Sequence, residues 1–214
     1  MDFWDRLDAV ADRWNVLRHP FYARWSNGEL TLEELSLYAG QYAHVVGALA
    51  AATRQAATDA PAHLAGELAE HAAEEEAHVD LWRQFGEAVD FDPADAPLAE
   101  TSDCVRAWSD PERGRLATLV ALYAIESAQP AISETKRAGL REHYGFAPGS
   151  ATAYFDTHVV LDREHARSGR ELIAGQLDAA AGDADALVAE AERVLAANWR
   201  LLDGVDRESA PLRA

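Results

Sequence analysis

Three side chains that can bind metal ions recur along one stretch of the sequence. His158, Asp162 and His165 are separated by four and three residues. An α-helix turns about 100° per residue, so these spacings return the side chains to one face on neighbouring turns. Two imidazoles and a carboxylate are costly to bury in a helical core unless something binds them. Neutral imidazole and carboxylate together suit iron, manganese or zinc, so the spacing predicts one side of a metal site.

A second stretch offers the same chemistry. Glu75-x-x-His78 is preceded by His71 and Glu74, and Glu126 lies on a third predicted helix. Glu-x-x-His pairs on two helices of a bundle, with a glutamate from each of two others, form the carboxylate di-iron pattern. A single Glu-x-x-His pair is also typical of an acidic, solvated helix face. Three ligand-bearing helices in one short chain favour the metal site over that alternative.

Length and composition indicate one globular domain that spans residues 1–214. The chain is 49% hydrophobic, yet no apolar run approaches the length of a membrane span. Its first residues lack a basic segment followed by an apolar one, so we expect no signal peptide. The single cysteine, Cys104, fits a reducing compartment, and no flanking residue marks it as a nucleophile. These features predict a cytoplasmic protein.

The charge of the chain excludes some classes of partner. The formal net charge is −18 and the acidic residues are spread along the whole sequence. Nucleic acid and anionic membranes repel such a protein, so we expect small molecules as its partners.

The periodicity predicts an all-α protein. Acidic and apolar residues alternate at helical spacing, and no strand-like alternation occurs. Helices are expected over residues 3–17, 19–27, 31–57, 60–88, 101–110, 112–129, 131–144, 149–176 and 182–204, with a clear loop at 90–97. Tryptophans on these helices are typical of a core, whereas buried tyrosines need partners for their hydroxyl groups and are better candidates for a polar cavity.

Several residues mark the expected ends of the helices. Thr31 and Glu34 form a capping-box pattern at the start of one helix. The sequence 109–111, Ser-Asp-Pro, predicts the start of another. Gly28 and Gly145 predict helix ends. Pro130 is expected to end or kink the helix that carries the proposed ligand Glu126.

Further segments resemble a known family. The segment 21–31 (FYARWSNGELT) resembles the entry segment of heme-oxygenase-like helical proteins, a group that includes the TenA thiaminases and the PqqC quinone-forming oxidases. The segments 78–85 (HVDLWRQF), 121–127 (ALYAIES) and 154–158 (YFDTH) are similar to those of the CADD-like 4-aminobenzoate synthases, which belong to the heme-oxygenase-like di-iron oxidases. The similarity covers roughly residues 3–175 and implies a single compact heme-oxygenase-like bundle.

The resemblance implies a ligand set for two metal ions. The ions would be two irons, or an iron and a manganese, and O2 would be the co-substrate. The implied ligands are His78, Glu126, His158, Asp162 and His165. The family has a glutamate where this chain has His71, so His71 itself, Glu74 or Glu75 is expected to complete the set.

The resemblance also implies catalytic residues within the chain. The CADD-like enzymes are self-sacrificing: one of their own tyrosines gives the aromatic ring of 4-aminobenzoate, a folate precursor, and a lysine gives the amino group. Those positions fall on Tyr22 and Lys136, and Lys136 is the only lysine in the sequence. An amino donor must lose a proton, which lysine can do in a dry pocket and arginine cannot. Ile125 stands where close relatives carry a tyrosine, which puts a radical relay through that position in doubt.

Three other functions remain open at this stage. One is a di-iron oxidase or oxygenase that acts on an exogenous small molecule. Another is a metal-free protein similar to TenA or PqqC, and a third is a helical interaction module. Metal content separates the last two from the oxidases, and product formation without added substrate separates the two oxidases. For the enzyme we expect a homodimer served by an unknown electron donor.

Overall fold

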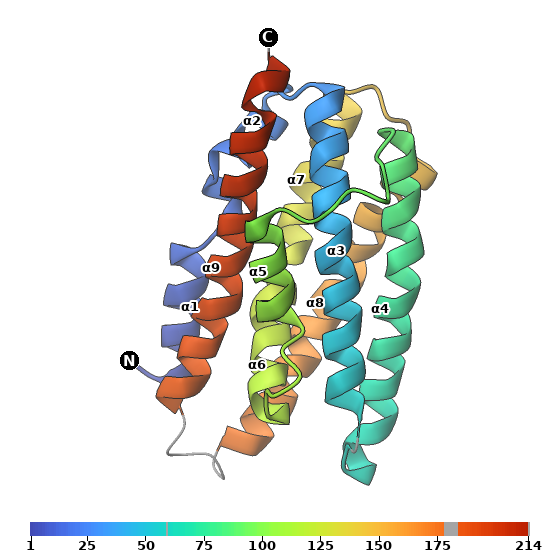
Figure 1. The fold of residues 1–214 in the computed structure, drawn as a ribbon. Helices are drawn as coiled ribbons and strands as arrows, with labels where there is room; N and C mark the ends of the chain where they lie inside the picture. The colour runs from blue at the N-terminus through green and yellow to red at the C-terminus, as the bar shows by residue number, and fades with distance from the viewer. Residues whose placement is uncertain (59, 178–183, 214) are drawn as a thin grey trace.

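The computed structural model describes residues 1–58, 60–177 and 184–213. Within these residues the secondary structure is helical, and no β-strand is formed. The helices are α1 Phe3–Arg13, η1 Val16–Arg18, α2 Pro20–Ser26, α3 Leu32–Ala57, α4 Ala62–Ala88, α5 Ala99–Trp108, α6 Arg115–Glu126, α7 Gln129–Glu142, α8 Ser150–Leu177, α9 Ala184–Ser209 and η3 Ala210–Arg213 (Figure 1). The all-α prediction is therefore confirmed.

The long helices pack side by side around a shared core. Figure 1 shows α3, α4 and α9 running roughly along the long axis of the bundle. Helix α4 packs against α3 and α8, and α8 also packs against α6 and α7. The three helices that carry the predicted metal ligands are therefore neighbours, with α8 in contact with both of the others.

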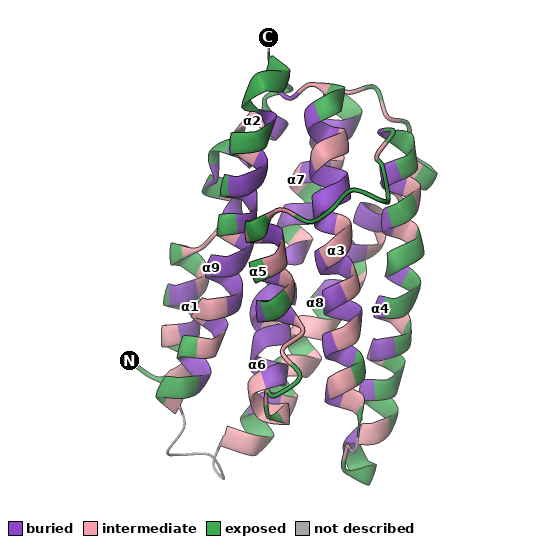
Figure 2. Ribbon diagram, in the orientation of Figure 1, coloured by how far each residue is buried: buried purple, intermediate pink, exposed green. Residues whose placement is uncertain are grey.

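The core is rich in aromatic side chains. The largest fully buried ones include Trp25, Trp82, Trp108, Tyr22 and Tyr38. The buried positions face inward on every long helix, as Figure 2 shows. Large rings lose little side-chain freedom on burial and contact many neighbours, so this core is rigid as well as apolar.

Most of the predicted helix ends are confirmed. The Thr31 side chain accepts from the Glu34 backbone N–H, and the Glu34 carboxylate accepts from Thr31 N–H. Gly28 follows the end of α2 with a φ of 70°, a conformation that glycine adopts without strain. Helix α6 ends at Glu126, and α7 begins at Gln129 with Pro130 in its first turn. Pro130 thus leaves Glu126 as the last residue of its helix.

Several predicted boundaries differ from the structure. The predicted helix 112–129 ends three residues early, at Glu126, and the predicted start at 182 lies outside the described residues. The segment 3–17 is divided, because the Asn15 side chain accepts from Leu17 N–H and begins η1. The 109–111 motif does not begin a helix: Asp110 accepts from Glu112 N–H within a turn, and α6 starts only at Arg115. Helix α9 continues five residues past Gly204, where the missing side chain leaves room for Glu100.

No helix among the described residues is long and apolar enough to cross a membrane.

One close helix contact places the lone lysine. Trp25 Nε1 donates to the Lys136 carbonyl oxygen at 3.1 Å. One turn further along α7, a Cβ on Gly139 would lie 2.6 Å from Trp25 Cδ1. The glycine therefore allows α7 to approach the indole, and this approach sets where the Lys136 side chain enters the core.

Gly139→Ala is expected to destabilise the fold by about 1–3 kcal/mol, because the added methyl group overpacks the contact with Trp25. Gly47→Ala is the matched control, since a Cβ there meets nothing within 4 Å. The control should be neutral or up to about 1 kcal/mol stabilising, since alanine favours a helix over glycine. Urea unfolding measures both, and equal effects would contradict the account of the α2–α7 contact.

Candidate metal centre

The structure brings the side chains of all seven predicted metal ligands together. They come from the three neighbouring helices α4, α6 and α8, and the residues are His71, Glu75, His78, Glu126, His158, Asp162 and His165. Spacings of four and three residues place the three α4 side chains on one face, and the α8 side chains have the same spacings.

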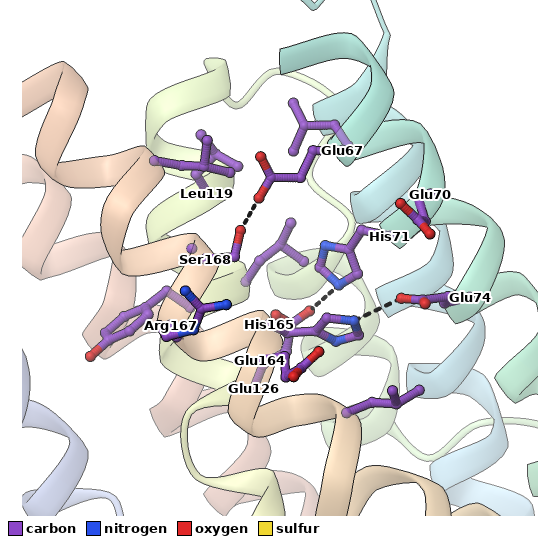
Figure 3. A pocket seen from close by; sticks show the side chains of 16 residues that line it. Glu67, Glu70, His71, Glu74, Leu119, Glu126, Glu164, His165, Arg167 and Ser168 are labelled. Atoms are coloured by element: carbon purple, nitrogen blue, oxygen red, sulfur yellow. Dashed lines mark hydrogen bonds and ion pairs between the residues drawn. The ribbon is translucent and has the colours of Figure 1, made fainter. Parts of the chain in front are cut away.

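Four of these side chains form a group at the solvent side of the centre. One potential ligand atom each from His71, Glu75, Glu126 and His165 lies within 4.8 Å of the others. His71 Nε2 is 3.0 Å from Glu126 Oε1, as the dashed line in Figure 3 shows. The two imidazole rings are 4.2 Å apart between centroids. We call these four residues the outer group.

A second group lies deeper in the bundle. Glu75, His78 and His158 each offer one ligand atom within 4.8 Å of the others, and all three residues are buried. His78 Nδ1 lies 3.0 Å from Glu75 Oε1. We call these three residues the inner group. Glu75 belongs to both groups, so its carboxylate would be shared by them if the centre held two ions.

The unpaired atoms of the centre fit a bound cation. His71 Nε2 faces Glu126 Oε1 in the 3.0 Å ion pair, and His165 Nδ1 lies 3.5 Å from Asp162 Oδ1. Three further buried atoms, Glu75 Oε2, His158 Nε2 and Asp162 Oδ2, have neither a hydrogen-bond nor an ion-pair partner among the described residues. Each unpaired buried polar group costs about 1–3 kcal/mol, so such groups are few in proteins. Imidazole nitrogens and carboxylate oxygens that converge without partners form a donor set suited to iron or manganese.

Hydrogen bonds on the far side of two imidazoles orient them toward the centre. His158 Nδ1 lies 2.7 Å from the Tyr154 carbonyl oxygen, to which it can donate, and this leaves Nε2 free. His165 Nε2 lies 2.8 Å from Glu74 Oε2, which leaves Nδ1 directed inward. Partners of this kind fix the tautomer and the orientation of metal-binding histidines. Glu74 therefore holds His165 from outside, whereas His71 and Glu75 lie within the centre.

The carboxylates change the protonation of their neighbours. Burial lowers the pKa of His165, but Asp162, Glu126 and Glu74 outweigh it and raise that pKa to about 9. Burial likewise acts to lower the pKa of His71, and Glu126 reverses the direction. Burial raises the pKa of Asp162 above its ordinary value. A field that attracts protons this strongly also attracts metal cations.

The two predicted catalytic residues lie in the aromatic core. Lys136 is only 2% exposed, and its Nζ donates to the Tyr38 hydroxyl at 2.6 Å. The Tyr38 hydroxyl is in turn 2.8 Å from that of Tyr22. Nζ also lies 4.9 Å from the ring centroid of Tyr22 and 4.8 Å from that of Tyr42. In the described part of the chain, no carboxylate forms an ion pair with this amine.

Burial without a counter-ion holds the pKa of the Lys136 amine well below its ordinary value. The neutral form, which has a nitrogen lone pair, is therefore favoured. This is the state that an amino donor requires.

Stacked and edge-on rings connect Lys136 to the metal centre. The Tyr42 and Trp82 rings are 4.9 Å apart, Trp82 and Tyr154 are 4.8 Å apart, and the Tyr154 ring stacks on His158 at 3.9 Å. The amine and the centre are thus neighbours through side chains, although Lys136 does not line the solvent cavity that reaches the ligands.

Two parts of the site were not found by sequence reasoning. Trp82 was expected only as a core residue, and its place between Tyr42 and Tyr154 depends on helix packing. The role of Glu74 as the partner of His165 joins residues 91 positions apart, for which no local signal exists. By contrast, tyrosines were expected at a polar cavity because of their hydroxyl groups, and Tyr38 contacts both Tyr22 and Lys136 in this way.

Solved structures share this fold. A protein from Shewanella denitrificans with a heme oxygenase-like fold superimposes with a TM-score of 0.78 at 20% identity, covering 100% of this chain and 96% of that one. The TenA homologue of P. horikoshii gives 0.79 at 17% identity, covering 97% and 99%. The fold is therefore of the heme-oxygenase-like, TenA-like type.

Sequence comparisons define the family. A family model described as iron-containing redox enzyme matches residues 30–199. A protein of Chlamydia muridarum named 4-aminobenzoate synthase is 34% identical over 185 residues, covering 81% of this chain and 78% of the relative. One of Nitrosomonas europaea with the same name is 29% identical, covering 95% and 90%. This chain belongs to the family of iron-containing redox enzymes, and it is an oxidoreductase.

Glu75→Ala is expected to lower metal affinity at least about tenfold, because Glu75 is shared by both ligand groups. Glu76→Ala is the matched control, since the neighbouring carboxylate is exposed and pairs with Arg54 at the surface. Elemental analysis after dialysis against a limiting metal concentration measures the bound ions. Equal metal content in both variants would place the centre elsewhere.

Lys136→Met is expected to stabilise the metal-free protein by about 1–3 kcal/mol at neutral pH, because an apolar side chain of similar length replaces a buried amine that has no counter-ion. The pKa of Lys136 is lower in the folded than in the unfolded chain, so the unfolded chain binds more protons between the two values. The free energy of unfolding of the wild type therefore rises with pH relative to that of the variant. The stabilisation gained by Lys136→Met shrinks toward alkaline pH. Thermal unfolding across a pH series measures it, and a gain that grows with pH would contradict the assignment.

Proposed function

We propose that this enzyme forms 4-aminobenzoate from its own Tyr22 and Lys136, using O2 and a pair of metal ions, two irons or an iron and a manganese. The observation that carries the proposal is the environment of Lys136. The only lysine of the chain is sealed in the core, where burial holds the pKa of its amine well below the ordinary value, and it is linked through the Tyr38 hydroxyl to that of Tyr22. The relatives named 4-aminobenzoate synthase support the same product.

The chemistry of the product explains why these groups are needed. To become 4-aminobenzoate, a tyrosine side chain must exchange its phenolic oxygen for nitrogen, lose its Cα–Cβ bond and oxidise Cβ to a carboxylate. Each change acts on a group that Tyr22 or Lys136 holds. The conversion is a net oxidation, and a bound metal pair would supply the oxidising equivalents from O2.

The surrounding residues prepare the reacting groups. Tyr38 bridges the Lys136 amine and the Tyr22 hydroxyl, so it holds the nitrogen near the ring and can pass a proton between the two. The rings of Tyr42 and Trp82 exclude water around the amine, at 4.8 and 5.8 Å from Nζ to their centroids. Exclusion of water favours the neutral amine and protects an oxidised ring from hydrolysis.

The donor set supports two ions. The outer group and the inner group share Glu75, so one carboxylate can serve both. Asp162 adds a further carboxylate, whose Oδ1 lies 3.5 Å from His165 Nδ1 and whose Oδ2 has no partner among the described residues. Position 71 lacks the glutamate that the family resemblance implies, and buried Glu75 offers a carboxylate one turn away in its place.

A second candidate function is favoured by a separate observation. A cavity of about 290 Å³ opens onto the outer group, and it could admit an exogenous small molecule. In that case the enzyme would turn over many times with no change in its own mass. The homodimer, the electron donor and the cytoplasmic location expected from the sequence remain predictions in either case.

Tyr22→Phe and Lys136→Arg should each abolish 4-aminobenzoate formation while metal content is retained. Phenylalanine removes the phenolic oxygen, and arginine cannot be deprotonated at the pH of the reaction. Tyr144→Phe is the control, because this tyrosine bonds the Leu30 backbone N–H outside the cluster. Chromatography of the product and intact-mass spectrometry of the chain are the measurements.

Wild-type protein should yield about one product per chain and lose mass as it does so. Product from Lys136→Arg would show that the nitrogen has another source. Many turnovers at constant chain mass would instead identify the exogenous-substrate oxidase.

A further inference from the structure

The cavity that reaches the metal centre has an acidic mouth. It lies between α4, α6 and α8, and its lining includes five glutamates: Glu67, Glu70, Glu74, Glu126 and Glu164 (Figure 3). Arg167 is the one arginine or lysine among the lining residues, and its guanidinium pairs with Glu171. The charge at the mouth is therefore strongly negative.

The cavity leads from exposed carboxylates to buried ligands. The side-chain exposure falls from 36% at Glu74 to 16% at His71, 11% at His165 and 3% at Glu126. Glu126 lines the cavity, and its Oε1 is paired with Nε2 of His71, which is itself a lining residue of the outer group. The cavity therefore ends on buried ligand atoms that pair with one another, which indicates a path for cations.

The two ligand groups differ in their access to this path. His71, Glu126 and His165 of the outer group line the cavity. Glu75, His78 and His158, which make up the inner group, are not among its lining residues and are at most 3% exposed. An ion that travels to the inner group must pass the ligands of the outer group.

We propose that this cavity is the entry port for the metal cations, and that the two groups fill in order. The inner group takes the first ion, because an ion resting in the outer group would block the path. The outer group takes the second ion and releases it first. This inference rests on the metal centre of the proposed function, but not on the reaction carried out there.

The negative charge at the mouth should speed the entry of cations. A cleft lined by charges of one sign concentrates ions of the other sign and can raise association rates by about 10- to 1000-fold. At physiological ionic strength, screening limits each exposed charge to about 8 Å. The net charge of −18 is spread over the chain, so the carboxylates at the mouth should dominate the rate at which cations enter.

The test measures how fast metal-free protein takes up Co²⁺, followed by its visible absorption in a stopped-flow instrument. The port variant is Glu67→Gln/Glu70→Gln/Glu164→Gln, which removes three charges from the mouth and none from the proposed ligands. The control is Glu33→Gln/Glu112→Gln/Glu142→Gln, which makes the same change of net charge at exposed residues outside the cavity.

At low salt the port variant should take up Co²⁺ about 3- to 10-fold more slowly, and the control less than about 2-fold more slowly. Both should bind two ions per chain, and the difference should shrink in high salt. Equal rates for the port variant and the control would overturn the port.

The order of filling has its own measurement. Wild-type protein receives one equivalent of radiolabelled Co²⁺ and then one of unlabelled Co²⁺, followed by an excess of chelator. The expected release is biphasic, with unlabelled metal in the fast phase and the label in the slow one. Label divided equally between the phases, or a single phase, would overturn the ordered filling.

The outcomes also separate this proposal from the proposed function. A chain that binds two ions at rates insensitive to the mouth charges keeps the metal centre and loses the port. A wild-type chain that binds no cation at all overturns both.

Discussion

The fold must hold three carboxylates close together in a buried place. Glu75, Glu126 and Asp162 repel one another as anions, and Glu75 Oε2 and Asp162 Oδ2 have lost water without gaining a partner among the described residues. Proteins tolerate such a cluster when a cation neutralises it and the surrounding framework is too rigid to let it open. The framework here consists of neighbouring helices locked by large aromatic rings, with Pro130 ending α6 directly after the segment that carries Glu126.

The amine and the metal centre face opposite physical requirements. A cation has to arrive from solvent, so its ligands need a path, and the outer group lines a cavity with an acidic mouth. Exclusion of water favours the neutral form of a lysine amine, and Lys136 is enclosed by rings and hydroxyls that exclude it. A chain of ring contacts joins the surroundings of Lys136 to the metal ligands, and it runs from Tyr42 through Trp82 and Tyr154 to His158. The two regions therefore touch, although Lys136 does not line the solvent cavity. A rigid aromatic layer can therefore separate water from the amine and still connect the amine to the candidate metal centre.

Local patterns in the sequence predicted the parts of the site that lie on single helices. The spacings of His158, Asp162 and His165 placed three side chains on one face, since helical geometry alone decides this. The capping box at Thr31 was found for the same reason. Local patterns could not decide whether Glu74 or Glu75 completes the ligand set. The two residues are adjacent on α4, and only the packing of the neighbouring helices distinguishes their surroundings. Packing against α8 directs Glu74 toward His165 and encloses Glu75. The prediction of a helix start at 109–111 was wrong because an aspartate side chain can accept a backbone N–H within a turn just as it does at a helix start.

Although position 71 carries a histidine, the centre has the same number of carboxylates that the family resemblance implies. The family resemblance implies a glutamate there, and a simple exchange for a neutral ligand would leave the centre with one anion fewer. Buried Glu75, one turn along the same helix, restores the count to three carboxylates with Glu126 and Asp162. Two divalent ions would then meet about three negative charges and four imidazoles, which leaves the centre with a small positive charge. Four imidazoles among the ligands favour late first-row metals, so access and supply would have to favour iron or manganese over tighter-binding ions. In the proposed entry route cations reach the ligands through the acidic cavity, so the selection of metal at this centre becomes partly a question of which ion arrives first.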